Sequence, residues 1–213
     1  MQIKFRQPVS GLTHAAGAIL SIIALMVMVI VDIRHKTIWN IIADTIFGSS
    51  LIMLYTTSAL YHLLPLEEKG INLLRQVDHT MIFILIAGTY TPFCLVTLRG
   101  PWGWSMLATI WGLAVAGIIT KFTWKSAPRF FRVTLYLLMG WLSLIMIYPL
   151  SQTALPGALI WLLIGGLCYT VGAIFYALKW PNPFPKIFGF HEIWHLLVLG
   201  GSFSHFWAVF RYV

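Results

Sequence analysis

Residues 11–31, GLTHAAGAILSIIALMVMVIV, decide the fold class. The stretch carries no Asp, Glu, Lys or Arg, and as a helix it is long enough to cross the roughly 30 Å hydrocarbon core of a bilayer. Polar and apolar residues do not alternate in it, so a helix is expected rather than a strand of a transmembrane barrel. The run is too long for a signal-peptide core and lacks a small-x-small cleavage site, so we expect the mature chain to start at Met1.

Comparable apolar runs recur along the 213 residues, of which 59% are hydrophobic and only 9% are charged, with a mean hydropathy of +0.85. We predict an all-α fold, a bundle of seven transmembrane helices that forms one integral-membrane domain over residues 1–213. The spans are expected near residues 11–31, 40–63, 73–98, 102–122, 131–149, 157–178 and 189–211.

The placement of lysine and arginine predicts the orientation of the bundle. Ten of these residues lie on the side of the N-terminus, and the other side has four, Arg34, Lys36, Arg99 and Arg211. By the positive-inside rule the N-terminus is cytoplasmic and the C-terminus lies outside. The net charge of +8 then reflects topology, and the short loops offer no folded basic surface for nucleic acid. The ten residues are Lys4, Arg6, Lys69, Arg75, Lys121, Lys125, Arg129, Arg132, Lys179 and Lys186.

Few ionisable residues fall inside the predicted spans, and each is a candidate for function because a polar group is costly in the bilayer. They are His14, Asp44, His62, Asp78, His79, His191, Glu192, His195 and His205. The two cysteines, Cys94 and Cys168, share no metal or redox spacing and are interpreted as small packing residues.

Three of the histidines are predicted to converge. His191 and His195 are four residues apart, so on a helix they lie one turn apart on one face. Zinc in a catalytic site takes three protein ligands, and alternation of the spans puts His62 in the same layer, within about two turns of the cytoplasmic edge. Asp78 starts the third span in that layer, where its carboxylate can serve as a general base. The alternative is three unrelated histidines, each hydrogen-bonded to a neighbour.

The other ionisable residues receive structural interpretations. His14 is interpreted as a capped or hydrogen-bonded structural histidine, although it lies on the cytoplasmic side and could brace the site or bind a headgroup. His79 points about 100° away from Asp78 around the helix. His205 lies about 15 Å from His195 toward the outer face, too far to share a metal ion. Asp44 is expected to be solvated or paired near the outer surface.

Several short motifs occur in an order that resembles the hemolysin III family, the bacterial branch of the progestin and adiponectin receptor superfamily. They are Ser-x-x-x-His at 58–62, Asp78-His79, Ala-Gly-Thr-Tyr-Thr-Pro at 87–92, Met-Gly-Trp at 139–141, His-x-x-x-His at 191–195 and His205-Phe206. The resemblance covers essentially the whole chain. It implies a multi-pass protein of the bacterial cytoplasmic membrane, with seven helices and a cytoplasmic N-terminus.

The resemblance also implies a site. Zinc would be held by His62, His191 and His195, Asp78 would orient the water that the metal activates, and Ser58 would lie beside the metal. The superfamily is grouped with alkaline ceramidases, so the implied chemistry is hydrolysis of a lipid amide or ester. Ser58 is more plausible as a hydrogen-bonding neighbour than as a nucleophile, because no separate base that would activate it is evident.

The stretch His191-Glu192-Ile193-Trp194-His195 also matches H-E-x-x-H, in which the Glu is the base of a zinc protease. Related receptors carry a non-acidic residue at the position of Glu192. We therefore expect Asp78, and not Glu192, to act as the base, and the protease interpretation is disfavoured.

The sequence leaves three functions open: a zinc-dependent hydrolase, a receptor or sensor with structural zinc, and a cytolytic pore former. The hydrolase would have membrane lipids as partners, including an acylated lipid substrate. The spans offer few polar rings that could line a pore. Three ligands and a water are the pattern of a catalytic zinc site, which favours the hydrolase.

Overall fold

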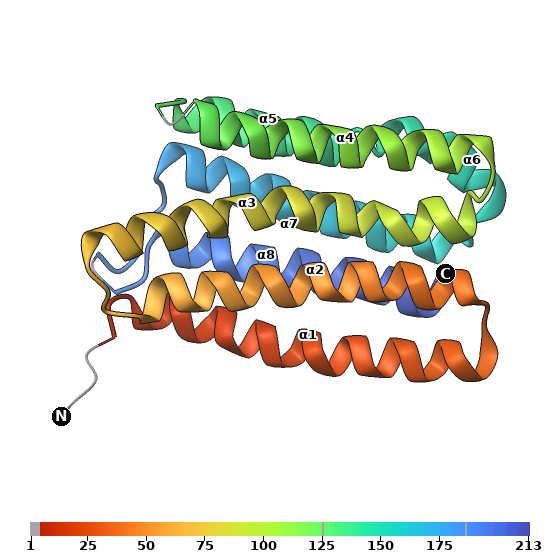
Figure 1. Ribbon diagram of the computed structural model, residues 1–213, viewed down its shortest axis with the longest axis horizontal. Helices are drawn as coiled ribbons and strands as arrows, with labels where there is room; N and C mark the ends of the chain where they lie inside the picture. Colours follow the sequence, from red (N-terminus) through yellow and green to blue (C-terminus); the bar gives the residue numbers. More distant parts are fainter. Residues whose placement is uncertain (1–4, 125, 186) are drawn as a thin grey trace.

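The computed structural model describes residues 5–124, 126–185 and 187–213 of the chain, and these residues form a bundle of antiparallel helices (Figure 1). Within the described residues, seven helical segments are long and apolar enough to cross a membrane, as the sequence predicts. The described residues contain no strand, only an isolated bridge between Phe184 and Phe188. The helices are α1 (Pro8–His35), α2 (Ile38–Leu63), α3 (Glu68–Pro92), the π-helical turn η1 (Phe93–Thr97), α4 (Pro101–Thr123), α5 (Arg129–Trp141), α6 (Leu144–Thr153), α7 (Pro156–Leu178) and α8 (Phe190–Tyr212).

Two of the spans are compound, which the sequence analysis did not predict. The third span consists of α3 and η1, and the switch to π-helical hydrogen bonding follows directly after Pro92. Proline has no backbone N–H, so the α-helical ladder loses a bond at that residue. The fifth span is broken between α5 and α6 at Leu142 and Ser143.

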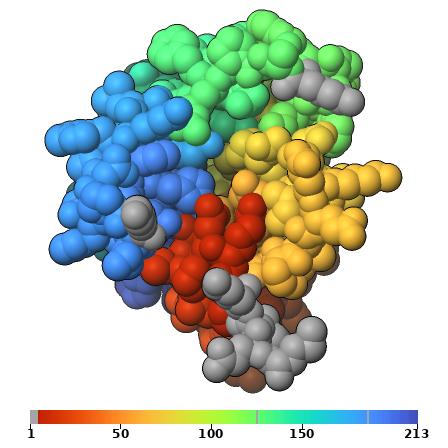
Figure 2. Space-filling view, turned by 90° about the vertical axis from the view of Figure 1, so that its left-hand side faces the viewer, coloured from red at the N-terminus to blue at the C-terminus, as the bar shows by residue number. Residues whose placement is uncertain are grey.

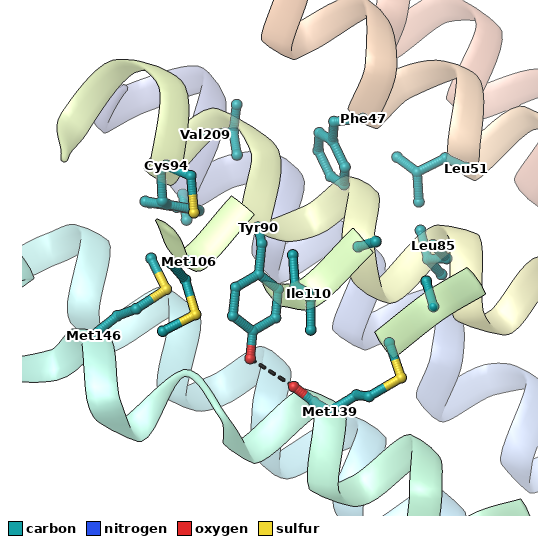
Figure 3. Packing of buried hydrophobic residues seen from close by; sticks show 14 of the residues in the cluster. Phe47, Leu51, Leu85, Tyr90, Cys94, Met106, Ile110, Met139, Met146 and Val209 are labelled. Atoms are coloured by element: carbon teal, nitrogen blue, oxygen red, sulfur yellow. Dashed lines mark hydrogen bonds between the residues drawn. The ribbon is translucent and has the colours of Figure 1, made fainter. Parts of the chain in front are cut away.

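A side chain from the third span occupies the break in the fifth. The Tyr90 hydroxyl donates toward the Met139 carbonyl oxygen at 2.7 Å, as Figure 3 shows, and it lies 2.8 Å from the Gly140 carbonyl oxygen. A carbonyl without a helical partner is costly in an apolar core, so this hydroxyl stabilises the break. The contact joins two of the motifs that the sequence analysis singled out, residues 87–92 and 139–141.

The start of α1 and the end of α8 lie at opposite ends of the bundle (Figure 1). Seven crossings require this arrangement. Alternation of the spans puts the described lysines and arginines of the predicted cytoplasmic group at the end where α1 begins. Lys4, Lys125 and Lys186 lie outside the described residues. Which end faces the cytoplasm stays a prediction.

The bundle is apolar on the outside as well as in its core. Ile19, Leu20 and Ile33 of α1 are each more than 60% exposed, whereas Phe47 and Ile110 are fully buried. Continuous apolar surface of this kind is unstable in water and is normally covered by lipid. The described helices therefore form an integral, multi-pass membrane protein.

Candidate metal centre

Three histidines from two distant helices meet near one end of the bundle. His62 is in the last turn of α2, and His191 and His195 are in the first two turns of α8. One ring nitrogen of each residue lies within 4.8 Å of the corresponding nitrogens of the other two. Figure 2 looks onto this end, where the starts of α1 (red) and α3 (yellow) meet segments near α5 (green) and α8 (blue).

Neighbouring groups fix the orientation of two of the rings. His62 donates from Nδ1 to the side-chain oxygen of Gln7, and His195 donates from Nδ1 to the backbone carbonyl of Ser10, at 3.1 Å. A hydrogen bond of this kind fixes the tautomer of a metal-binding histidine. It leaves the Nε2 lone pair of each ring free to bind a cation.

The spacing of two of the nitrogens suits a tetrahedral metal. The Nε2 atoms of His62 and His191 are 3.3 Å apart. Zinc–nitrogen bonds of about 2.0–2.1 Å in tetrahedral geometry place two ligand nitrogens roughly 3.3 Å apart. At this distance His191 can donate from Nε2 to His62 Nε2, and a cation between the two nitrogens would replace that proton. The three histidines could therefore hold a metal ion.

A cavity of about 50 Å³ adjoins the histidines, and Asp78, Ser58, His191 and His195 are among its lining residues. A volume of this size holds a few water molecules. Asp78 is not part of the three-histidine cluster, but its carboxylate shares the cavity with two of the histidines. A carboxylate so placed can accept a proton from a molecule in the cavity.

Glu192 has a different setting from Asp78. One of its carboxylate oxygens accepts the Ser10 hydroxyl at 2.7 Å, and the other accepts the backbone N–H of Gly189 at 2.8 Å. The second bond caps the N-terminus of α8, and the first ties α8 to α1. Both oxygens of Glu192 therefore have structural partners, and which carboxylate acts as the base stays a prediction.

His14 is closer to the site than the sequence analysis expected. Its ring stacks on His195 with centroids 3.6 Å apart and lines the cavity that contains Asp78. The side chain is only 3% exposed, and neither ring nitrogen has a hydrogen-bond partner among the described residues. The interpretation as a hydrogen-bonded structural histidine is therefore wrong.

The start of α1 also contributes to the site, which the sequence did not predict. Gln7, Ser10 and His14 each contact a candidate ligand histidine, directly or through the backbone. These residues are three and four positions apart, so they share one face of the helix. Polar residues at this spacing at the start of an otherwise apolar span were the available signal.

The remaining ionisable residues are not in the three-histidine cluster. His79 borders the cavity, and its Nδ1 is 3.0 Å from Lys121 Nζ. His205 is stacked against Tyr169 of α7 and is not in the three-histidine cluster. Asp44 is 1% exposed, so the part of the expectation that allowed a solvated carboxylate is wrong. Both cysteines are free.

These features define an integral membrane protein with seven helical spans and a histidine cluster that could hold a metal ion. The sequence profile of the family described as Haemolysin-III related matches residues 3–206, and the chain belongs to that family. It is 44% identical to Hemolysin-3 of Bacillus cereus, over 96% of this chain and 90% of the relative. It is 39% identical to the Hemolysin-3 homolog of Bacillus subtilis (strain 168), over 95% of this chain and 92% of the relative. A more distant relative, the human Monocyte to macrophage differentiation factor, is 26% identical over 82% of this chain and 72% of the relative. This likeness supports membership of the progestin and adiponectin receptor superfamily.

Proposed function

We propose that the protein is a zinc-dependent hydrolase that cleaves a lipid amide or ester within the membrane. The observation that carries this proposal is the cluster of His62, His191 and His195 beside a cavity that Asp78 lines and that holds a few water molecules. A closed structural zinc site uses four protein ligands, whereas a catalytic site uses three and leaves one position open.

The histidines and Asp78 would have different roles in the reaction. His62, His191 and His195 would hold zinc, which supplies a Lewis acid and lowers the pKa of water. Asp78 would accept a proton from the attacking water and pass it to the departing amine or alcohol. The oxygen of water then forms a bond to the acyl carbon as the C–N or C–O bond breaks, giving a fatty acid and the free headgroup. Ser58, at 2% exposure in the same cavity, would donate a hydrogen bond there.

The apolar surroundings favour a lipid as substrate. Leu54, Ile82, Val133 and Val198 line the same cavity as the histidines and Asp78. The cavity is too small for an acyl chain, so the scissile carbonyl would enter while the chain stays along the helix surfaces in the bilayer. With the predicted orientation, the reaction would take place in the cytoplasmic leaflet of the cytoplasmic membrane.

The test combines metal analysis with a hydrolysis assay. Purified protein is expected to carry close to one zinc per chain by elemental analysis, and His191→Ala is expected to carry less than a tenth of that. Wild-type protein should release fatty acid from at least one member of a panel of ceramides, lysolipids and acyl amides. A zinc-loaded protein that leaves the whole panel intact would contradict the proposal.

The names of the Bacillus relatives make lysis the alternative to measure in parallel. Dye release from vesicles is expected to be absent, or to depend on hydrolysis. Lysis of vesicles by His191→Ala at the wild-type rate would favour a pore former instead.

A further inference from the structure

Two arginines border the cavity that adjoins the three histidines. Arg129 and Arg132 lie in the first turn of α5, and both are among the lining residues, together with Asp78 and His14. Hydrolysis of an uncharged amide or ester requires no arginine at this position. The pair therefore needs an explanation beyond the proposed reaction.

Arginines near the ends of membrane spans commonly serve as anchors that reach outward to headgroups. These two side chains face inward instead. The Arg129 guanidinium lies 4.5 Å from the centroid of the Tyr176 ring of α7 and donates to the Tyr176 carbonyl at 3.0 Å. Arg132 donates to the Ala127 carbonyl at 2.7 Å. Both are half-buried against protein groups.

Neither guanidinium is neutralised. Among the described residues, no carboxylate lies within 4.0 Å of Arg129 or Arg132, and the one ion pair found is at the opposite end of the bundle. Each arginine has five N–H donors, and one hydrogen bond is seen for each side chain. Several charged donors per side chain thus remain for a ligand.

The charge in the cavity points to an anion. Two arginines and one carboxylate, Asp78, leave an excess of one positive charge, and a divalent cation on the three histidines would raise it to three. Unlike charges attract strongly where water is scarce, so a negatively charged group has the largest gain from entering this region.

A second observation also indicates a ligand. Both ring nitrogens of His14 lie buried beside the cavity without a hydrogen-bond partner. An unsatisfied buried polar group is unfavourable, so these atoms would gain from an occupant with polar atoms that can reach them.

We propose that Arg129 and Arg132 bind the phosphate of an acyl lipid, so that the substrate is an anionic phospholipid with a phosphate monoester rather than a neutral ceramide or glyceride. The assignment of this lipid as a substrate rests on the proposed hydrolase function. Guanidinium groups pair with phosphate through two parallel N–H···O bonds, which suits a monoester with its free oxygens.

The size of the cavity limits how this lipid can bind. About 50 Å³ accommodates a carbonyl group and a few waters, but neither a whole headgroup nor an acyl chain. The phosphate would lie at the arginines at the end of the bundle, the carbonyl would reach toward Asp78 and the histidines, and the chain would extend between helices into the bilayer.

The binding test compares two lipids that share one acyl ester. Protein in phosphatidylcholine nanodiscs is titrated with 1-oleoyl lysophosphatidic acid or 1-oleoylglycerol, with and without removal of metal. Wild-type protein should bind the phosphorylated lipid at least tenfold more tightly, and Arg132→Gln should remove most of that preference. Arg132→Lys should keep part of it, because the charge remains while the paired hydrogen bonds are lost.

Arg75→Gln is the matched control. Arg75 is exposed in α3 at the same end of the bundle, bonds to Asn72 and does not border the cavity. Equal binding of the two lipids, or an equal loss of binding with Arg75→Gln and Arg132→Gln, would overturn the proposal in favour of diffuse attraction. Glycerol 3-phosphate bound as tightly as the lysolipid would overturn the assignment of a lipid.

Fatty acid release separates this inference from the proposed function. Preferred cleavage of the phosphorylated lipid, reduced at least tenfold by Arg132→Gln, would support both. If 1-oleoylglycerol is cleaved equally fast, the headgroup assignment fails and the hydrolase stands. If neither lipid is cleaved but the binding preference and its dependence on Arg132 persist, the hydrolase fails for these lipids and the phosphate site stands.

Discussion

The two ends of the bundle both bury ionisable side chains, but with different chemistry. At the end where α1 begins, His62, His191 and His195 have nitrogens that face one another beside a cavity. At the opposite end, Asp32 and Asp44 are fully or almost fully buried, and Asp32 pairs with Lys36 at 3.4 Å.

The opposite end has the features of a structural contact. Lys36 follows Asp32 by one turn, close to the connection between α1 and α2. Thr37 then caps the start of α2 through Asn40, and the Asn40 side chain donates to the carbonyl of Val213 at the end of α8. These polar groups join helix ends to one another. At the histidine end, by contrast, the hydrogen bonds to Gln7 and Ser10 hold two rings so that their other nitrogens stay free.

Burial of a charged or polar side chain thus does not by itself identify a functional site in this protein. Asp32 and Asp44 also have buried oxygens without a hydrogen-bond partner among the described residues. The distinguishing feature of the histidine end is that three nitrogens converge beside a cavity. Substitutions at the histidine end should therefore change activity or metal binding more than stability, and substitutions at the opposite end should do the reverse.

Asp78→Asn tests the histidine end with the largest expected effect. Removal of the proposed base should lower hydrolysis by about 10²–10⁴-fold, because an amide cannot accept the proton. Zinc content and melting temperature should stay close to wild type, since Asp78 is not in the histidine cluster. The measurements are fatty acid release, elemental analysis and thermal unfolding. Asp44→Asn is the control at the other end, and a comparable loss of turnover there would break the distinction.

Lys36→Met tests the opposite end. It leaves the buried Asp32 carboxylate without its cation, and removal of one partner from a buried pair costs about 3 kcal/mol. The melting temperature should fall, while zinc content and the activity of the folded fraction remain. Loss of zinc by a folded Lys36→Met protein would show that the two ends are coupled.

Gln7→Ala tests how the His62 ring is held in place. The Gln7 side chain accepts the hydrogen bond from His62 Nδ1, and loss of such a partner typically lowers metal affinity 10–100-fold. The measurement is zinc affinity by competition with a chelator. An unchanged affinity would mean that the backbone contact between Gln7 and His62 suffices to position the ring.

Glu192→Gln should have the smallest effect. The amide oxygen can still accept one of the two hydrogen bonds, so the cost to stability is about 1 kcal/mol. Most of the hydrolysis should remain. If Glu192→Gln abolishes turnover at normal zinc content while Asp78→Asn does not, the H-E-x-x-H interpretation would be restored.

The sequence by itself determined the number of spans and the layer of the candidate site. Hydropathy is a property of contiguous residues, so seven apolar runs translate directly into seven crossings. The spacing of His191 and His195 follows from the helical repeat. The alternation of the crossings puts His62 and Asp78 at the same end as these two residues.

Only the tertiary structure decided which helices are neighbours and which way their side chains turn. Lipid-facing and helix-facing sides of a span are both apolar, so composition does not reveal the rotation or the lateral order of the helices. For this reason the sequence predicted neither the stacking of His14 on His195 nor the inward direction of Arg129 and Arg132. The sequence also did not predict the Tyr90 hydrogen bond at the break in the fifth span, because this bond depends on two helices that pack side by side.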